Sequence, residues 1–593
     1  MSRFFSLLKK LTSTPVRRFF TCLLLGLCLF LAGCCLSTPT FYDNDDTNIA
    51  FALAGYLSGE PYPAHPFLNP ILSAFVSFLY RILPWLPWWY LLQAAAVLIS
   101  LAVVGACLFA IGEEKGLHPL LSLALFFGLA LGSFYYPLFL ATFTLTSACL
   151  GTAAVCLLLV PKKNDQSFTK GDLLSLVFLA LAFLFRNSSG ISLLCFYAGA
   201  LVYRLARLAA KKANKSAILS LTALGACALV LSLCLVFINS WGRAHLHDPG
   251  FPEFDEGRSR FLDYPVDSYS ENPELYAALG WDGPLYNLVK HWFYMDERVT
   301  TEALTAIQAG SKATPPRTPA AIFEELYRFF SLRPLAVYTA LVPCLFLLGG
   351  LFRIRQEQNS RLPLLFALLM LLGGCALTLY LVLSGRIVLR AFQLIAIPTG
   401  ASVLFLSLLA LPKREEAAKK SLSLSRRLWG IPSLISLGLA LVLCCQLGRM
   451  TLRYDGTELL MESRALFAYV LEHPDTVFIR DTHVANNVDA LTVYPDQKPV
   501  NLLDWGGTSA YTGAKQLQLE RFDLLPFTAE VFFREDVRLI TSPDSRDYKS
   551  FVSYLESRYP GADLRLETMI TEQAAVYRVM PADQEALYGQ NPA

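Results

Sequence analysis

The sequence predicts an all-α polytopic membrane domain followed by a small extracytoplasmic α/β domain. Hydrophobic residues make up 54% of the 593 positions, more than a water-soluble globule can bury. They are concentrated in long runs with few charges, and a run of about 20 apolar residues matches the roughly 30 Å hydrocarbon layer. The basic residues gather in the short loops between these runs.

About 11 apolar segments are expected to cross the membrane as helices. They are 19–36, 88–111, 119–135, 137–160, 172–185, 188–202, 217–238, 334–352, 362–384, 392–411 and 429–447. Short loops rich in Lys and Arg stay in the cytoplasm. With this set of spans, all such loops fall on one side; they carry Lys9, Lys10, Arg17, Arg18, Lys162, Lys163, Arg204, Arg207, Arg353, Arg355, Lys413 and Arg414. We therefore expect a multi-pass protein of the plasma membrane with a cytoplasmic N-terminus.

This topology divides the chain into a membrane domain, 1–448, with external loops 37–87 and 239–333, and an external α/β domain, 449–593. In the α/β domain, short apolar runs predict strands, a run ending at Pro560 and Gly561 predicts a helix, and alternating apolar positions predict paired strands. The two single strands are expected at 477–479 and 537–540, the helix at 548–559 and the paired strands within 564–579.

Segments 47–57 and 69–83 of the first external loop are expected to be helices along the outer membrane surface. Segment 69–83 is short, carries Arg81 and precedes a cluster of Pro and aromatic residues typical of an interface. Counting it as a span would place the later basic loops outside. A tilted hairpin of two short spans is the alternative.

All 14 cysteines lie in apolar segments, so we expect no disulfide or Cys-ligated metal outside the membrane. Leu31, Ala32, Gly33 and Cys34 resemble a bacterial lipoprotein cleavage site. An uncleaved first helix is the favoured interpretation because many spans follow it.

The densest acidic group, Asp43, Asp45 and Asp46, follows the first predicted span. Three neighbouring carboxylates repel one another, so a cation, a proton or a function is needed to hold them together. Capping of the next helix by Asp46 or Thr47 would explain at most one of them. Downstream, Glu60 and His65 are expected near the same surface, where they could bind substrate.

With its first helix, acidic outer loop, surface helices, further spans and external C-terminal domain, the chain resembles the GT-C superfamily of membrane glycosyltransferases. More narrowly, it is similar to a bacterial branch of glycosyltransferase-like membrane proteins. The resemblance implies a sugar donor linked to a polyprenyl phosphate, and an acidic catalytic base in the first external loop. That base would be Asp45 or Asp46, with Asp43 a weaker candidate.

A lipid phosphate that leaves during sugar transfer needs cationic stabilisation. Arg186 lies in a turn between two short apolar segments, and Arg386 and Arg390 lie between two strongly apolar spans. Four residues apart, Arg386 and Arg390 would share one helical face and could hold a phosphate. Alternatively, all three arginines extend to the outer lipid head groups.

The remaining external motifs allow both functional and structural interpretations. His245 and His247 are spaced like a metal pair but lack an evident third ligand. Three aromatic and acidic stretches could bind sugar or form turns and cores; they are 280–283, 291–294 and 503–507. No residue is predicted as a metal ligand and no cofactor is expected, although the acidic group could hold Mg²⁺ or Mn²⁺.

The leading hypothesis is an inverting transferase that moves a sugar from a lipid-linked donor to a glycan, lipid or protein acceptor at the outer membrane face. Its expected partners are these substrates and membrane lipids. Nucleic acid is not expected, because acids offset the external basic residues. A transporter or flippase for lipid-linked or polymeric sugars is one alternative, and a noncatalytic cell-envelope assembly protein or sensor is another.

Overall fold

A computed structural model describes most of the chain. The described residues are 10–42, 44–161, 169–211, 214–313, 315, 317–351, 361–411, 438–439, 442–443, 446, 457–484, 488–507 and 509–582. The predicted span 429–447 lies largely outside them, and Asp43 lies outside them entirely.

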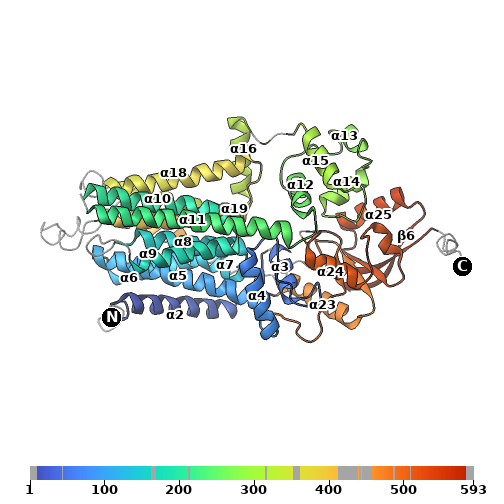
Figure 1. Ribbon diagram of the computed structural model, residues 1–593, viewed down its shortest axis with the longest axis horizontal. Helices are drawn as coiled ribbons and strands as arrows, with labels where there is room; N and C mark the ends of the chain where they lie inside the picture. The colour runs from blue at the N-terminus through green and yellow to red at the C-terminus, as the bar shows by residue number, and fades with distance from the viewer. Residues whose placement is uncertain are drawn as a thin grey trace.

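A bundle of helices along the long axis forms one end of the molecule (Figure 1). Its helices are α2 (Pro15–Cys34), α5 (Trp88–Lys115), α6 (Pro119–Leu129) continued by η1 (Ala130–Phe134) and α7 (Tyr135–Phe139), α8 (Phe143–Leu159), α9 (Lys170–Phe185), α10 (Asn187–Ala210), α11 (Lys215–His245), α17 (Pro334–Leu351), α18 (Arg361–Leu383) and α19 (Leu389–Leu409). Helices α8 and α19 are buried along nearly their whole length, so they form the centre of the bundle.

Seven helices of the described chain are long and apolar enough to cross a membrane. They are Pro15–Cys34, Trp88–Lys115, Pro119–Phe139, Asn187–Ala210, Lys215–His245, Arg361–Leu383 and Leu389–Leu409. The chain is therefore a multi-pass membrane protein, and the larger predicted number of spans remains a prediction. Two of the predicted spans are short helices, α8 with 17 residues and α9 with 16.

Both helices predicted in the first external loop form, but their surroundings differ. Helix α4 (Pro70–Ile82) crosses the bundle axis (Figure 1) and exposes Ile71, Phe75, Phe78 and Ile82 along one face. This apolar face suits a helix on a membrane surface, and its contact with lipid stays a prediction. Helix α3 (Asn44–Ala54) is instead buried by protein, so the expected surface position is wrong for it.

The burial of α3 has a simple cause. Helix α23 (Thr457–Glu472) of the C-terminal domain covers it, and the rings of Phe51 and Phe467 meet edge to face with centroids 5.5 Å apart. Another helix that crosses the bundle axis, α16 (Pro319–Ser331), was not predicted; it exposes Phe323 and Tyr327 (Figure 1).

The C-terminal domain contains a five-stranded sheet with the order β4-β3-β5-β7-β6. Its elements are β3 (Val477–Arg480), β4 (Leu502–Asp504), α24 (Gly513–Arg521), η4 (Ala529–Phe533), β5 (Val537–Thr541), α25 (Arg546–Arg558), β6 (Asp563–Thr571) and β7 (Ala574–Met580). Strand β3 is parallel to β4 and β5, whereas β7 is antiparallel to both β5 and β6. The predicted small α/β domain is confirmed; the short strand β4 was missed.

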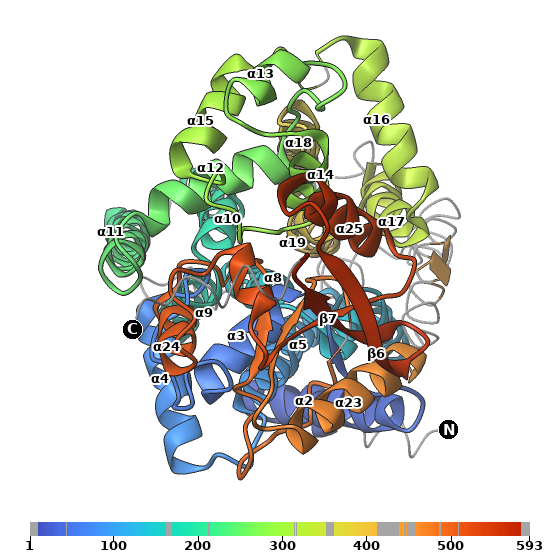
Figure 2. The ribbon, with the colours of Figure 1, turned by 90° about the vertical axis from the view of Figure 1, so that its right-hand side faces the viewer.

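Helices of the segment predicted as the second external loop pack against the C-terminal domain, and these helices and that domain together form the outer region of the molecule. The loop helices are α12 (Phe251–Asp263), α13 (Pro273–Ala277), α14 (Gly283–Lys290) and α15 (Thr301–Gly310), and they lie beside the sheet domain (Figure 2). One hydrophobic core joins loop residues Trp281 and Phe293 to Trp505 and Phe551 of the C-terminal domain. A Cβ on Gly506 would stand 1.7 Å from the carbonyl oxygen of Trp292, so this position needs glycine.

Candidate functional site

A short pairing of two distant segments fixes the acidic stretch. Strand β1 (Thr40–Phe41) runs parallel to β2 (Leu140–Ala141), and the N–H of Tyr42 donates to the carbonyl of Ala141 over 3.0 Å. This contact sets the first turn of α3 beside the first turn of α8. The side chains of α3 therefore meet the centre of the bundle.

Asp46 points into that junction and is fully buried. Its Oδ1 accepts from Trp89 Nε1 over 3.3 Å, from Gln93 Nε2 over 3.1 Å and from the N–H of Phe143 over 3.1 Å. Burial raises the pKa of Asp46 to about 7. These contacts join α3 to α5 and α8, and one of them satisfies an N–H group at the start of α8. Asp46 therefore holds the three helices together.

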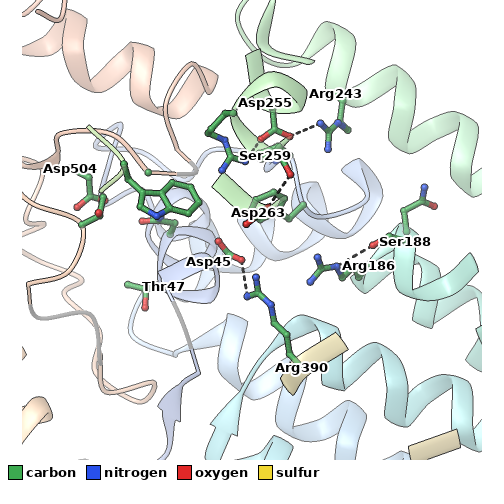
Figure 3. A pocket seen from close by; sticks show the side chains of 18 of the residues that line it. Asp45, Thr47, Arg186, Ser188, Arg243, Asp255, Ser259, Asp263, Arg390 and Asp504 are labelled. Atoms are coloured by element: carbon green, nitrogen blue, oxygen red, sulfur yellow. Dashed lines mark hydrogen bonds and ion pairs between the residues drawn. The ribbon is translucent and has the colours of Figure 1, made fainter. Parts of the chain in front are cut away.

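Asp45 points elsewhere because successive residues of a helix are about 100° apart. Its Oδ2 lies 3.0 Å from Arg390 Nη1, and its side chain borders a cavity (Figure 3). Burial raises the pKa of Asp45, and the guanidinium groups of Arg186, Arg258 and Arg386 oppose that increase. The geometry thus separates the two predicted aspartates.

The cavity has a volume of about 490 Å³ and lies where the bundle meets the outer region. Its charged lining combines six arginines and four aspartates from both parts of the molecule: Arg186, Arg243, Arg258, Arg386, Arg390 and Arg480, with Asp45, Asp255, Asp263 and Asp504. The cavity is therefore a polar chamber with an excess of positive charge, suited to an anionic ligand.

Arg186 occupies the break between α9 and α10. Its backbone is extended, with φ −156° and ψ 114°, so α9 ends at the residue before it and α10 begins at the residue after it. The guanidinium donates to Thr144 Oγ1, and to Ser188 Oγ over 3.2 Å, and stands 4.7 Å from the centre of the Phe143 ring. No carboxylate of the described chain lies within ion-pair distance of Arg186, which leaves its charge available to a ligand.

Arg386 and Arg390 also reach the cavity, although the expected shared helical face is wrong. Helix α18 ends at Leu383, Gly385 follows in the left-handed region with φ 71°, and α19 begins only at Leu389, so Arg386 lies before the helix. Arg386 Nη2 is 2.6 Å from Asp263 Oδ2 of α12. Each arginine thus has its own aspartate, and Arg386 connects the bundle to the outer region.

The side of the cavity formed by the outer region, called its outer wall, was only partly predicted from the sequence. Arg480 and Asp504 end the parallel strands β3 and β4 in register, and Arg480 Nε lies 2.6 Å from Asp504 Oδ1. Asp255 pairs with both Arg258 and Arg243, the latter over 2.7 Å. Carboxyl ends of parallel strands commonly border ligand sites, and recognition of β4 would have pointed to Asp504.

Two other predicted substrate-binding residues are absent from the residues that line the cavity. Glu60 is exposed at the surface. His65 is buried, its Nδ1 accepts from the N–H of Phe67 over 3.4 Å, and burial lowers the pKa of His65 to about 3. His65 is thus a neutral part of the core.

The remaining motifs divide between core and cavity. In 280–283, Trp281 is buried and Asp282 caps α14. This stretch therefore forms a core and a turn, as the structural alternative predicted. In 291–294 and 503–507, Trp292, Asp504 and Gly507 line the cavity, whereas Trp505 is core. The ring of His245 stacks on Trp241, and burial lowers the pKa of the neighbouring His247 to about 4.

The fold and this site define a multi-pass helical membrane protein with a charged chamber beneath a small α/β domain. No family model and no curated protein matches the chain. Among solved structures, it is similar to ArnT from Cupriavidus metallidurans in the apo state, with a TM-score of 0.39 and 13% identity over 94% of this chain and 98% of that one. It is also similar to ArnT from the same organism bound to undecaprenyl phosphate, with a TM-score of 0.37 and 14% identity over 93% and 97%.

Proposed function

We propose that the chain is a membrane glycosyltransferase of the GT-C type, which moves a sugar from a polyprenyl-phosphate-linked donor to an acceptor at the outer membrane face. The observation that carries this proposal is the cavity that brings Asp45 together with Arg186, Arg386 and Arg390. A carboxylate beside several guanidinium groups, at the end of an apolar bundle, supplies what sugar transfer from a lipid phosphate requires.

Asp45 is the proposed base. As an acceptor hydroxyl attacks the anomeric carbon, its proton passes to Asp45, the new glycosidic bond forms and the bond from that carbon to the phosphate oxygen breaks. Attack from the side opposite the phosphate inverts the anomeric centre. Burial raises the pKa of Asp45, which makes its carboxylate a stronger base than an exposed one.

The arginines are the proposed phosphate ligands. Arg186 can bind the phosphate directly because its close contacts are hydroxyl groups and an aromatic ring, and Asp45 interacts with it only from beyond ion-pair distance. Arg390 is held 3.0 Å from Asp45, so a bound phosphate would compete for Arg390. That competition would release the carboxylate to accept a proton, which couples donor binding to activation of the base.

The charge distribution favours this proposal over transport. A flippase would need polar groups along a path through the bundle, whereas the central helices α8 and α19 bury mainly apolar side chains. The charges of the cavity gather at the end of the bundle that meets the outer region.

Asp45→Asn tests the base, with Glu60→Gln as a matched control outside the cavity. In cells lacking the protein, mass spectrometry should find an accumulated polyprenyl-linked sugar that wild type and Glu60→Gln clear and Asp45→Asn does not. General base removal typically costs about 10²- to 10⁴-fold in rate. Purified Asp45→Asn should still bind undecaprenyl phosphate. Full turnover by Asp45→Asn would contradict the proposal. If cells lacking the protein lost transport of a lipid-linked sugar across the membrane but kept the same glycans, the flippase alternative would be favoured.

A further inference from the structure

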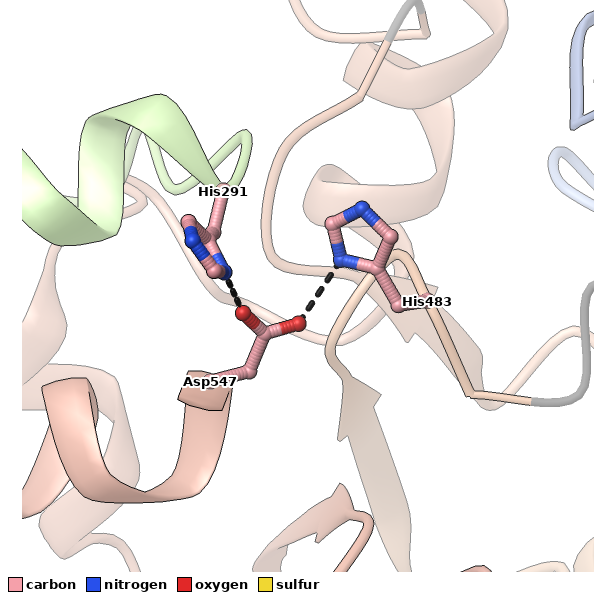
Figure 4. Close-up of side chains that lie close together, drawn as sticks. All are labelled: His291, His483 and Asp547. Atoms are coloured by element: carbon pink, nitrogen blue, oxygen red, sulfur yellow. Dashed lines mark hydrogen bonds and ion pairs between the residues drawn. The ribbon is translucent and has the colours of Figure 1, made fainter. Parts of the chain in front are cut away.

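A cluster of ionisable side chains lies outside the cavity lining. His291 follows α14 in the second external loop, His483 follows β3, and Asp547 lies in the first turn of α25. One ligand atom from each lies within 4.8 Å of the others (Figure 4). Three segments that are distant in the sequence therefore converge at one point.

Asp547 is the centre of this cluster. Its side chain is only 6% exposed, and its two oxygens face different rings: Oδ1 lies against His291 Nδ1, and Oδ2 is 2.7 Å from His483 Nδ1 (Figure 4). A carboxylate this deeply buried needs a compensating partner. The two imidazoles approach it from separate segments, so their side chains surround a common centre.

The neighbouring backbone holds the ligands in place. Asp481 Oδ1 accepts from the N–H groups of His483 and Val484 over 2.8 and 3.0 Å, which fixes the turn that carries His483. Thr482 Oγ1 donates to the carbonyl of His291 over 3.3 Å. Arg546 adds a positive charge near His291, and the carboxylate of Asp547 offsets it.

We propose that His291, His483 and Asp547 form a zinc site. Two imidazole nitrogens and one carboxylate oxygen are a donor set that Zn²⁺ commonly takes, with a further position for water. Mg²⁺ and Ca²⁺ prefer oxygen ligands, so this set disfavours them. The site is separate from the proposed sugar-transfer chemistry, because none of its ligands lines the cavity.

The position of the cluster gives the metal a structural role. Trp292 follows His291 and Thr482 precedes His483, and both of these neighbours line the cavity. A metal bound to the three ligands would join the loop, the β3 turn and α25 behind the outer wall. Zinc would therefore stabilise the wall without contacting the substrate.

The competing explanation is a metal-free hydrogen-bonded set, in which both imidazoles donate to Asp547. Zinc content separates the two explanations. We would purify the full-length protein without a polyhistidine tag and measure its zinc by mass spectrometry, then titrate Zn²⁺ or Co²⁺ into protein stripped by a chelator. His483→Gln is the informative variant because its side chain is 53% exposed and its loss leaves the core intact. His473→Gln, at an exposed site outside the cluster, is the control.

Wild type and His473→Gln should retain roughly one zinc per chain, give visible Co²⁺ absorption bands and unfold at a lower temperature after chelation. His483→Gln should bind zinc more weakly by at least about tenfold, and chelation should not change its unfolding temperature. Equal zinc binding by wild type and His483→Gln would overturn the site, as would wild-type protein that binds none. Neither result depends on transferase activity, so failure of this site and failure of the proposed function are distinguishable.

Discussion

The cavity has one wall formed by the outer region and one formed by the helix bundle. Both walls carry arginines, but the partners of these arginines differ. On the outer wall, Arg480 pairs with Asp504, and Arg243 and Arg258 both pair with Asp255. On the bundle wall, Arg390 pairs with Asp45, but the guanidinium of Arg186 contacts two hydroxyls and an aromatic ring. Charges in close ion pairs largely cancel and hold the protein in shape, whereas a guanidinium with no carboxylate of the described residues within ion-pair distance can still attract an anion. The outer wall is therefore a scaffold, and Arg186 is the expected centre of anion binding.

The largest effect should follow from breaking a pair on the outer wall. Arg480 and Asp504 have side chains only 5% and 11% exposed, so Asp504→Asn would leave a buried guanidinium without its carboxylate. We expect a loss of about 3–5 kcal/mol in the free energy of unfolding, measured on the purified protein. The double variant Arg480→Met, Asp504→Leu removes both charges and should recover most of that loss. Lost turnover at unchanged stability would instead show that Asp504 contacts substrate.

Arg186 should give the opposite pattern. Arg186→Gln removes a charge that would stabilise the leaving phosphate, so turnover should fall by about 10²- to 10³-fold, equivalent to about 2.7–4 kcal/mol in the transition state. Its two hydrogen bonds to hydroxyls contribute about 1.5–3 kcal/mol each, but removing a largely buried charge relieves a desolvation cost of opposite sign, so the free energy of unfolding should change little. Turnover and binding of undecaprenyl phosphate are the measurements.

Arg328→Gln provides the matched control for Arg186, because Arg328 is exposed on α16 and is absent from the residues that line the cavity. It should leave both measurements unchanged. If Arg186→Gln bound undecaprenyl phosphate as tightly as wild type, the difference between the two walls would have no functional meaning.

The sequence predicted those features of the molecule that depend on local pattern. Apolar runs gave the helices of the bundle, and alternating positions gave the β6–β7 hairpin. The three arginines singled out at the ends of apolar segments line the cavity, and their binding of a phosphate stays a prediction.

Features that depend on distant contacts were not predictable. Asp45 and Asp46 are equivalent in the sequence, and the pairing of β1 with β2, about 100 residues away, decides which one faces the cavity. The burial of α3 depends on α23, near the other end of the chain. The cluster of His291, His483 and Asp547 likewise exists only after the loop and the C-terminal domain have packed together. Spacing along the chain contains no signal for such contacts.

Asp46→Asn should give the smallest effect on turnover and should separate the two neighbouring aspartates. Since burial raises the folded-state pKa of Asp46 to about 7, above the unfolded value of about 4, the folded protein binds the extra proton between these values. Its contribution to stability is therefore largest at low pH and declines as pH rises from about 4 to about 7, by at most about 1.4 kcal/mol per pH unit. Asn mimics the protonated side chain, so unfolding of Asp46→Asn should lose this dependence and turnover should persist at neutral pH. An unchanged pH dependence in Asp46→Asn, or a loss of turnover as deep as that of Asp45→Asn, would show that the two carboxylates do not have separate roles.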